Sequence, residues 1–136
     1  MATVTTKYLG GLRTESVHIQ SGSKLMTDAP TDNHGKGGAF SPTDLVAAAY
    51  GACVLSIIGI AAQAQGFTID GAEIQTTKVM GTDPRRIVEL ILEVTLPHNN
   101  YSTNEREIIE QAAKACPVGN SLHPATKKTV TFAYRS

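Results

Sequence analysis

The chain contains two cysteines, Cys53 and Cys116, and this residue type is the one best suited to nucleophilic and redox chemistry. A thiolate attacks peroxides and disulfides, and two neighbouring cysteines can hold the oxidised product as a disulfide. A reactive thiolate needs a nearby cation, a helix N-terminus or a base that lowers its pKa. Free cysteine is also among the most buried residue types, so position alone leaves open whether the two thiols are reactive or inert.

Arg13 is the best candidate for the required cation, because it stands at the Gly-rich end of a predicted strand. Its guanidinium could pair with the carboxylate of Asp44, which would hold it in position. Taken singly, each residue also has a simpler interpretation. Arg13 would be a solvated strand-end charge, and Asp44 would only cap the helix in which it stands.

Two predicted helices must position the cysteines. The first begins at Ser41 and Pro42, which suit the N-cap and the first helical position, and its apolar run continues to Gln65. Cys53 lies in the middle of this helix, among alanines and a glycine that permit another backbone or a substrate to approach closely. The helix dipole therefore lowers the pKa of Cys53 little.

The second helix is predicted to begin at Ser102, which forms a capping-box pattern with Glu105. Its apolar residues recur on one face at helical spacing, and they are Ile108, Ile109, Ala112, Ala113 and Cys116. Pro117 stops or restarts this helix, and a short helical turn is predicted within residues 117–126. Both cysteines thus belong to helices that are expected to pack together in the core.

The remaining segments read as strands of alternating or β-branched residues, at residues 3–9, 14–20, 23–28, 67–81, 85–96 and 129–135. This order of strands and helices predicts a mixed α+β domain with mostly antiparallel pairing, a long central helix and a second, amphipathic helix. No repeat, linker or low-complexity tract divides the sequence. We therefore expect a single domain over residues 1–136.

The charge pattern excludes several classes of partner. The chain has 12 basic and 12 acidic residues and no run of Lys or Arg longer than a pair. It therefore lacks the basic footprint expected for binding nucleic acid or an anionic membrane. Residues 45–64 have the length of a membrane span, but they include Ser56 and Gln63 and lack flanking basic residues, so we interpret them as a buried core helix. The N-terminus has no signal-peptide pattern, which favours the cytoplasm.

Other catalytic patterns are not supported. The four histidines, at positions 18, 34, 98 and 123, have no His or Cys partner at zinc-ligand spacing, so no metal is expected. The glycines of residues 35–38 lack the spacing of a phosphate-binding loop. Ser56 and Ser121 have no convincing His and Asp partners, so a hydrolase triad is not favoured.

Three segments carry a resemblance to a known family. They are GLRTES around Arg13, GGAFSPTDLVAAAYGACVLSIIGIAAQAQGF around Cys53, and KACPVGNSL around Cys116. In this order and at this separation they resemble the OsmC/Ohr family of osmotically inducible and organic hydroperoxide resistance proteins. The resemblance extends over essentially the whole chain. It implies the OsmC-like fold and an intertwined homodimer whose active sites lie at the subunit interface.

The resemblance also implies roles for the candidate residues. Cys53 matches the peroxidatic cysteine, Cys116 the resolving cysteine and Arg13 the activating arginine. Asp44 stands where the organic hydroperoxide members have a glutamate that pairs with the arginine, and its side chain is one methylene shorter. The implied activity is a thiol-dependent peroxidase that acts on organic hydroperoxides and more weakly on hydrogen peroxide. A dithiol such as a lipoyl protein would regenerate it without a metal or organic cofactor.

Two further functions remain open at the level of sequence. The chain could be a non-catalytic dimer of the same fold that binds a small molecule, or a redox sensor that uses the same disulfide as a switch. An apolar wall formed by Val54, Ile57, Ile58 and the Ile108 face is expected to suit an organic hydroperoxide. A depressed pKa of Cys53 and repeated turnover would distinguish the enzyme from the other two.

Overall fold

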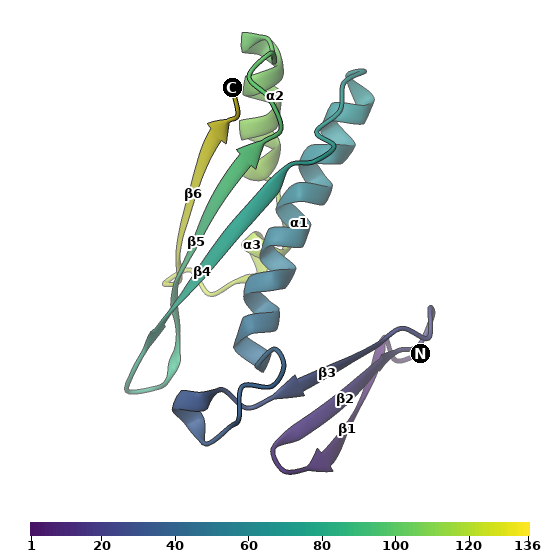
Figure 1. Cartoon of the computed structure of the whole chain (residues 1–136), viewed down its shortest axis with the longest axis vertical. Helices are drawn as coiled ribbons and strands as arrows, with labels where there is room; N and C mark the ends of the chain where they lie inside the picture. Colours follow the sequence, from purple (N-terminus) through teal and green to yellow (C-terminus); the bar gives the residue numbers. More distant parts are fainter. The chain divides into compact units, whose positions relative to one another are not determined.

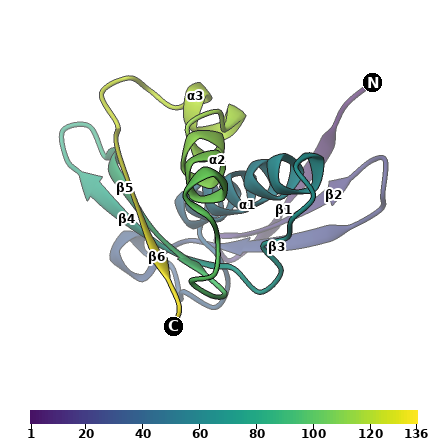
Figure 2. The ribbon, with the colours of Figure 1, turned by 90° about the horizontal axis from the view of Figure 1, so that it is seen from above.

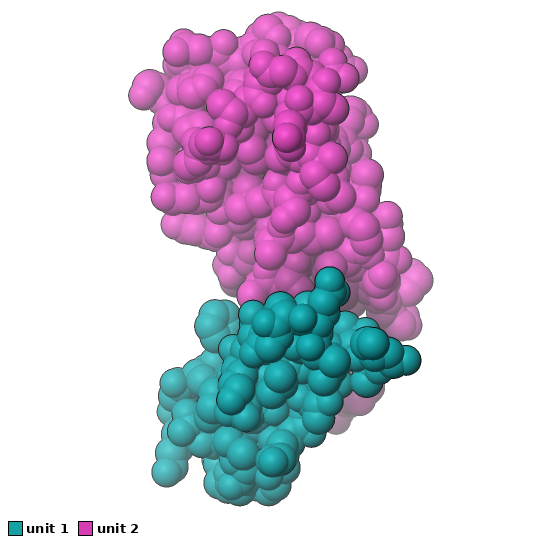
Figure 3. Space-filling model, turned by 90° about the vertical axis from the view of Figure 1, so that its right-hand side faces the viewer, with its two compact units in different colours: residues 1–46 teal, residues 47–136 magenta.

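The structure is a computed structural model that describes all 136 residues. The elements in chain order are β1 (Val4–Gly10), β2 (Arg13–His18), β3 (Lys24–Asp28), a short 3-10 turn (Thr31–Asn33), α1 (Pro42–Ala64), β4 (Glu73–Gly81), β5 (Arg86–Leu96), α2 (Thr103–Ala113), α3 (Pro117–Ser121) and β6 (Lys127–Tyr134) (Figure 1). They divide into two compact units, residues 1–46 and residues 47–136 (Figure 3). One domain over residues 1–136 stays a prediction.

The first unit is built on a three-stranded antiparallel sheet in the order β1-β2-β3. The predicted Gly-rich hairpin between β1 and β2 is confirmed, since Gly10 and Gly11 both have positive φ angles, of 89° and 61°. Glycine adopts this conformation without the steric cost that a Cβ atom brings. In the next pair of the sheet, Arg13 on β2 lies opposite Asp28 on β3.

The second unit contains a sheet in the order β4-β5-β6, and Figures 1 and 2 show α1, α2 and α3 on the same face of it. Every second residue of β5 points into the core, and the four residues concerned are at most 1% exposed: Leu90, Leu92, Val94 and Leu96. The alternation of period two in the sequence therefore marks the face that the helices cover. A Cβ atom at Gly51 of α1 would lie 3.1 Å from Thr76 Oγ1 of β4, so this glycine permits close packing of helix on sheet.

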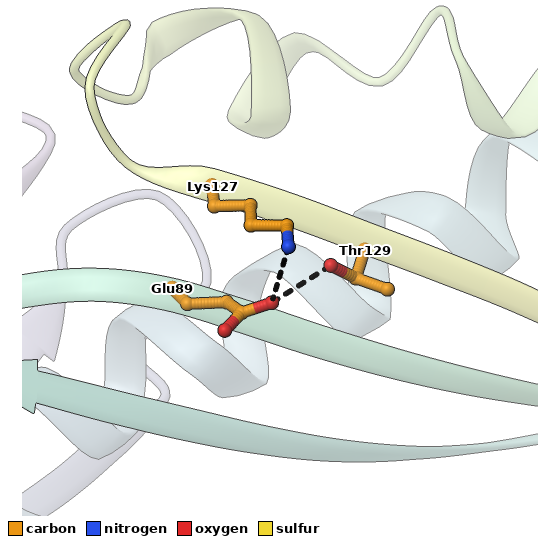
Figure 4. Close-up of polar contacts among 3 residues, drawn as sticks. All are labelled: Glu89, Lys127 and Thr129. Carbon is orange, nitrogen blue, oxygen red and sulfur yellow. Dashed lines mark hydrogen bonds and ion pairs between the residues drawn. The ribbon is translucent and has the colours of Figure 1, made fainter.

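Strand β6 joins the sheet in parallel to β5, whereas the other three strand pairs are antiparallel. The prediction of mostly antiparallel pairing is thus confirmed. At the start of this parallel pair, Glu89 Oε2 accepts a hydrogen bond from the Thr129 hydroxyl at 2.8 Å and lies 3.9 Å from Lys127 Nζ (Figure 4). Exposed ion pairs contribute little, so the hydrogen bond is the stronger local link between the strands.

Two predicted boundaries are wrong. The strand expected from residue 67 begins only at Glu73, because Phe67 N–H still bonds to Ala62 O at the end of α1 and a turn closes between Ile69 O and Ala72 N–H. The helix expected to run to Cys116 ends at Ala113. The residue before a proline disfavours the helical region, and Cys116, before Pro117, has an extended conformation with ψ of 119°.

By length and composition alone, α1 is the one helix that could cross a membrane. One face of it is buried within the fold, and this face consists of Ala47, Tyr50, Gly51, Val54, Ile58 and Ala62. The opposite face carries small uncharged residues and remains exposed, and Ile60 there is 63% exposed. The prediction of a buried core helix is therefore met on one face only, because the opposite face of this helix is exposed.

Candidate functional site

The helix that carries Cys53 begins with the predicted capping box. Asp44 N–H donates to Ser41 Oγ at 3.1 Å, and Ser41 N–H donates to Asp44 Oδ2 at 3.0 Å. These bonds satisfy backbone donors that a helix start otherwise leaves unpaired. Cys53 follows about two and a half turns later and is half-buried, so α1 presents its thiol at the boundary of the core.

Cys116 is the N-cap of α3, and its Sγ accepts the N–H of Gly119 at 3.5 Å. The residue is only 2% exposed. A Cβ atom at position 119 would lie 3.0 Å from Cε1 and 3.2 Å from the hydroxyl oxygen of Tyr50, so glycine permits this close approach of α3 to α1. Tyr50, Cys116 and Gly119 therefore form one packed cluster.

The two thiols interact. Burial raises the pKa of Cys116 above its ordinary value, and the Cys53 side chain raises it further, while the N–H groups of Gly119 and Val118 lower it. The pKa of Tyr50 is also raised, first by burial and then by the neighbouring charges of Cys116 and Cys53. Both cysteines are free thiols. The fold thus brings Cys53, Cys116 and the Tyr50 phenol together, and Tyr50 was not among the predicted site residues.

The raised pKa values of Cys116 and Tyr50 predict that the reduced protein loses stability in alkaline solution. The unfolded chain releases the Cys116 proton near the ordinary thiol pKa of about 8.5, whereas the folded chain keeps it to higher pH. The contribution to stability is complete below that value and is lost as the pH rises through the pKa of the folded protein. We expect the urea midpoint to fall between about pH 8 and pH 10, and to fall less in Cys116→Ser. Equal pH dependence in both proteins would contradict this expectation.

In the first unit, Arg13 lies opposite a carboxylate that the sequence analysis missed. Asp28 is 2% exposed, and its Oδ2 accepts the N–H of Gly38 at 2.9 Å. Its Oδ1 is buried and has no hydrogen-bond partner. A Cβ atom at Gly38 would lie 3.1 Å from Asp28 Oδ2 and 3.8 Å from Arg13 Nη2, so the guanidinium and the carboxylate approach the same glycine.

The register of the predicted strands could have identified Asp28 as the residue opposite Arg13. Residues directly opposite in an antiparallel pair lie on the same face of the sheet. The structure places Arg13 on β2, and Asp44 at the start of α1, where it completes the capping box. The pairing of Arg13 with Asp44 stays a prediction. The same holds for the action of Arg13 on Cys53.

One part of the predicted substrate wall is wrong. Val54 and Ile58 are both fully buried, because they belong to the face of α1 that the fold covers. They cannot line an open substrate site in this conformation. Ile57 and Ile108 are half-buried and remain candidates for an apolar wall. No group of three or more His, Cys, Asp or Glu side chains is arranged to hold a metal ion.

Comparisons with known proteins agree with this arrangement. The family model described as OsmC-like protein matches residues 35–131. The chain is 42% identical to a crystal structure from Psychrobacter arcticus, provisionally named as an osmotic stress induced and detoxification response protein, with a TM-score of 0.92 over 97% of this chain and 96% of that one. The comparison with curated proteins finds no match.

More distant structures share the fold. An organic hydroperoxide resistance protein OsmC from Legionella pneumophila is 23% identical, with a TM-score of 0.76 over 98% of both chains. An organic hydroperoxide resistance protein from Elizabethkingia anophelis is 18% identical, with a TM-score of 0.76 over 99% of this chain and 98% of that one. The family match spans most of the chain and includes both cysteines. The chain therefore belongs to the OsmC-like protein family.

Proposed function

We propose that this protein is a thiol-dependent peroxidase that reduces organic hydroperoxides, and more weakly hydrogen peroxide. Membership of the OsmC-like family supports a role in peroxide resistance. The observation that carries the proposal is that the fold brings two free thiols together, Cys53 from α1 and Cys116 from the N-cap of α3. A half-buried thiol beside a buried one is suited to attack followed by resolution.

The proposed cycle has three steps. The Cys53 thiolate attacks the distal peroxide oxygen, the O–O bond breaks, and the alkoxide takes a proton and leaves as an alcohol. The Cys116 sulfur then attacks the Cys53 sulfenic acid, which forms a disulfide and releases water. An external dithiol restores both thiols by exchange and is itself oxidised to a disulfide. This chemistry requires no metal or organic cofactor.

Arg13 has the proposed role of favouring the Cys53 thiolate and binding the peroxide oxygen, because a guanidinium is a permanent cation with several donors. Asp28 then acts as a positioning residue for Arg13. The two residues are directly opposite across β2 and β3, and Asp28 Oδ1 has no hydrogen-bond partner. A carboxylate with one unpartnered oxygen beside a guanidinium favours one orientation of that group.

Substitution of Asp28 by asparagine tests this role. Asp28→Asn retains an acceptor for the Gly38 N–H and removes a buried charge, so we expect stability within about 1 kcal/mol of the wild type. The rate of Cys53 oxidation is expected to fall by up to about tenfold, equivalent to about 1.4 kcal/mol of activation free energy. Stopped-flow peroxide oxidation and urea unfolding measure the two effects. An unchanged oxidation rate would remove Asp28 from the site.

We further propose that the protein is a homodimer. The exposed face of α1 carries Ala48, Ala49, Ala52 and Ile60 and has no charged side chain. Strands β1 and β3 also expose large apolar residues, including Tyr8 and Leu25. Monomeric proteins seldom leave large apolar surfaces in water, and a second copy of the chain would cover these apolar residues in each unit. Sedimentation equilibrium measures the mass of the protein in solution, and a homodimer should have the mass of two chains.

We interpret α1 as a core helix, because the fold covers one of its faces. We propose that the chain acts in the cytoplasm, where a dithiol such as a lipoyl protein is available to reduce it. The proposed substrate is an organic hydroperoxide. Nucleic acids and membranes are not proposed as partners, because the balanced charge offers neither of them an attractive surface.

Repeated turnover is the test of the proposed function. Reduced protein is mixed with excess cumene hydroperoxide in two reactions. The free thiol content of the protein is followed without dithiothreitol, and the consumption of peroxide is followed with it. We expect rapid loss of both thiols in the absence of reductant and many turnovers per chain in its presence. Slow oxidation that stops at one equivalent would instead support a non-catalytic binding protein or a redox sensor.

A further inference from the structure

A cavity of about 350 Å³ lies between α2, α3 and β6 in the second unit. This volume falls within the range that proteins use to bind small organic molecules. Cys116 and Tyr50 both contribute to the wall of the cavity. The packed cluster of Tyr50, Cys116 and Gly119 therefore has a cavity beside it that is large enough for a ligand.

The cavity reaches one cysteine and not the other. Cys116 lines it, whereas Cys53 does not. In the proposed cycle the peroxide meets Cys53, and Cys116 meets an external molecule only when the disulfide is reduced. A reactive molecule held in this cavity therefore contacts the sulfur that takes part in reduction.

The wall of the cavity indicates the chemistry of its ligand. Val130 and Phe132 of β6 give it an apolar side. Two exposed lysines, Lys114 and Lys128, and one carboxylate, Glu110, supply its charges. Glu110 Oε2 accepts the Tyr134 hydroxyl at 2.9 Å, and Lys128 Nζ donates to Thr126 O at 3.5 Å. Two ammonium groups against one carboxylate leave an excess of positive charge on this wall. A compact molecule with an apolar body and an anionic group fits this wall.

We propose that this cavity binds the reducing dithiol, of an anionic and partly apolar class, and directs its attack to Cys116. The proposal rests on the peroxidase cycle given above. One thiolate of the reductant attacks the Cys116 sulfur, the Cys53–Cys116 bond breaks, and Cys53 leaves as a thiolate. The second thiol of the reductant then attacks its own sulfur in the mixed disulfide, which frees Cys116 and closes the reductant into a cyclic disulfide.

The acidity of Cys116 agrees with this direction of attack. Burial raises the pKa of the Cys116 thiol, and thiols of high pKa are poor leaving groups in disulfide exchange. Attack at Cys53 would have to expel Cys116, whereas attack at Cys116 expels Cys53. The chemical preference and the position of the cavity thus select the same sulfur.

A bulky substitution inside the cavity tests the proposal. Val130→Phe fills the space from β6, and Thr131→Phe is the matched control, because Thr131 is an exposed neighbour on the same strand that does not line the cavity. The disulfide is formed with diamide, so that its reduction can be measured without peroxide chemistry. Reduction by dithiothreitol or by dihydrolipoate, an anionic dithiol that can close into a cyclic disulfide, is followed by thiol titration, and oxidation of reduced protein by cumene hydroperoxide is measured separately.

We expect Val130→Phe to slow disulfide reduction by at least about tenfold and to leave the rate of peroxide oxidation within about twofold, with no effect of Thr131→Phe. Wild-type reduction rates in Val130→Phe would overturn the cavity assignment while the peroxidase proposal stands. Slowed reduction in a protein that never turns over peroxide would overturn the peroxidase and retain the cavity. Failure of diamide to link Cys53 to Cys116 within one chain would overturn both.

A charge reversal that leaves the packing intact provides the second arm. Lys114→Glu combined with Lys128→Glu changes two exposed side chains, and Lys24→Glu is the control because Lys24 is exposed and does not line the cavity. We expect the double variant to slow disulfide reduction by dihydrolipoate about tenfold more than it slows reduction by the neutral dithiothreitol. An equal effect on both reductants would overturn the anionic class of the ligand.

Discussion

Replacement of Cys53 by serine is expected to abolish peroxide turnover, with a loss on the order of 10³-fold or more. A serine hydroxyl has almost no anionic form at neutral pH, whereas a thiol is partly ionised and intrinsically nucleophilic. The substitution is nearly isosteric at a half-buried position, so the fold should be retained. Stopped-flow consumption of cumene hydroperoxide measures the activity, and urea unfolding verifies that the variant folds.

Cys116→Ser is the matched control for this result, since it removes the other thiol of the pair. The Cys53 sulfenic acid should then form at the wild-type rate and persist, because its resolving partner is missing. A dimedone adduct detected by mass spectrometry at Cys53 would identify it. If Cys53→Ser retains turnover while Cys116→Ser loses it, the roles of the two cysteines are reversed. If both variants retain it, the reaction does not use these thiols.

Ile58→Ala is expected to destabilise the protein by about 2–5 kcal/mol. Ile58 is fully buried on the face of α1 that the fold covers, so truncation removes apolar contact and leaves a cavity. This helix also carries Cys53 and Tyr50, so a smaller core contact should loosen the cluster around the thiols. Urea unfolding of the reduced protein measures the loss.

Ile60→Ala, two residues further along the same helix, is the control for Ile58→Ala. Ile60 is 63% exposed, so its truncation should change the stability of an isolated chain by no more than about 0.5 kcal/mol. If a second copy covers this face, Ile60→Ala should instead weaken association, and its effect on the midpoint should depend on protein concentration. Equal losses in both variants at every concentration would contradict the burial assigned to α1.

Much of the fold could be predicted from local patterns. The capping boxes at Ser41–Asp44 and Ser102–Glu105 marked the starts of α1 and α2, and both are present in the structure. The alternation in residues 86–96 marked the buried face of β5. These signals depend on hydrogen bonds and periodicities within a few residues, which a sequence displays directly.

The boundaries near Cys116 could not be predicted as reliably. The apolar periodicity continues from Ala113 to Cys116, yet α2 ends at Ala113 and Cys116 caps α3. Pro117 made both outcomes compatible with the sequence. In the structure α3 begins at Pro117 and Gly119 packs closely against Tyr50 of α1, a contact between residues far apart in the chain.

The amino-acid sequence was enough to predict which side chains can do chemistry, where the helices that carry them begin, and the family to which the chain belongs. The burial of Cys116 beside Cys53, the presence of Tyr50 next to them and the position of Asp28 opposite Arg13 are properties of the fold. The physical reason is that burial and the pKa of a thiol depend on contacts between residues far apart in the chain. Such contacts leave no local periodicity, so they follow from the packing of helices on the sheet and from the register of the strands.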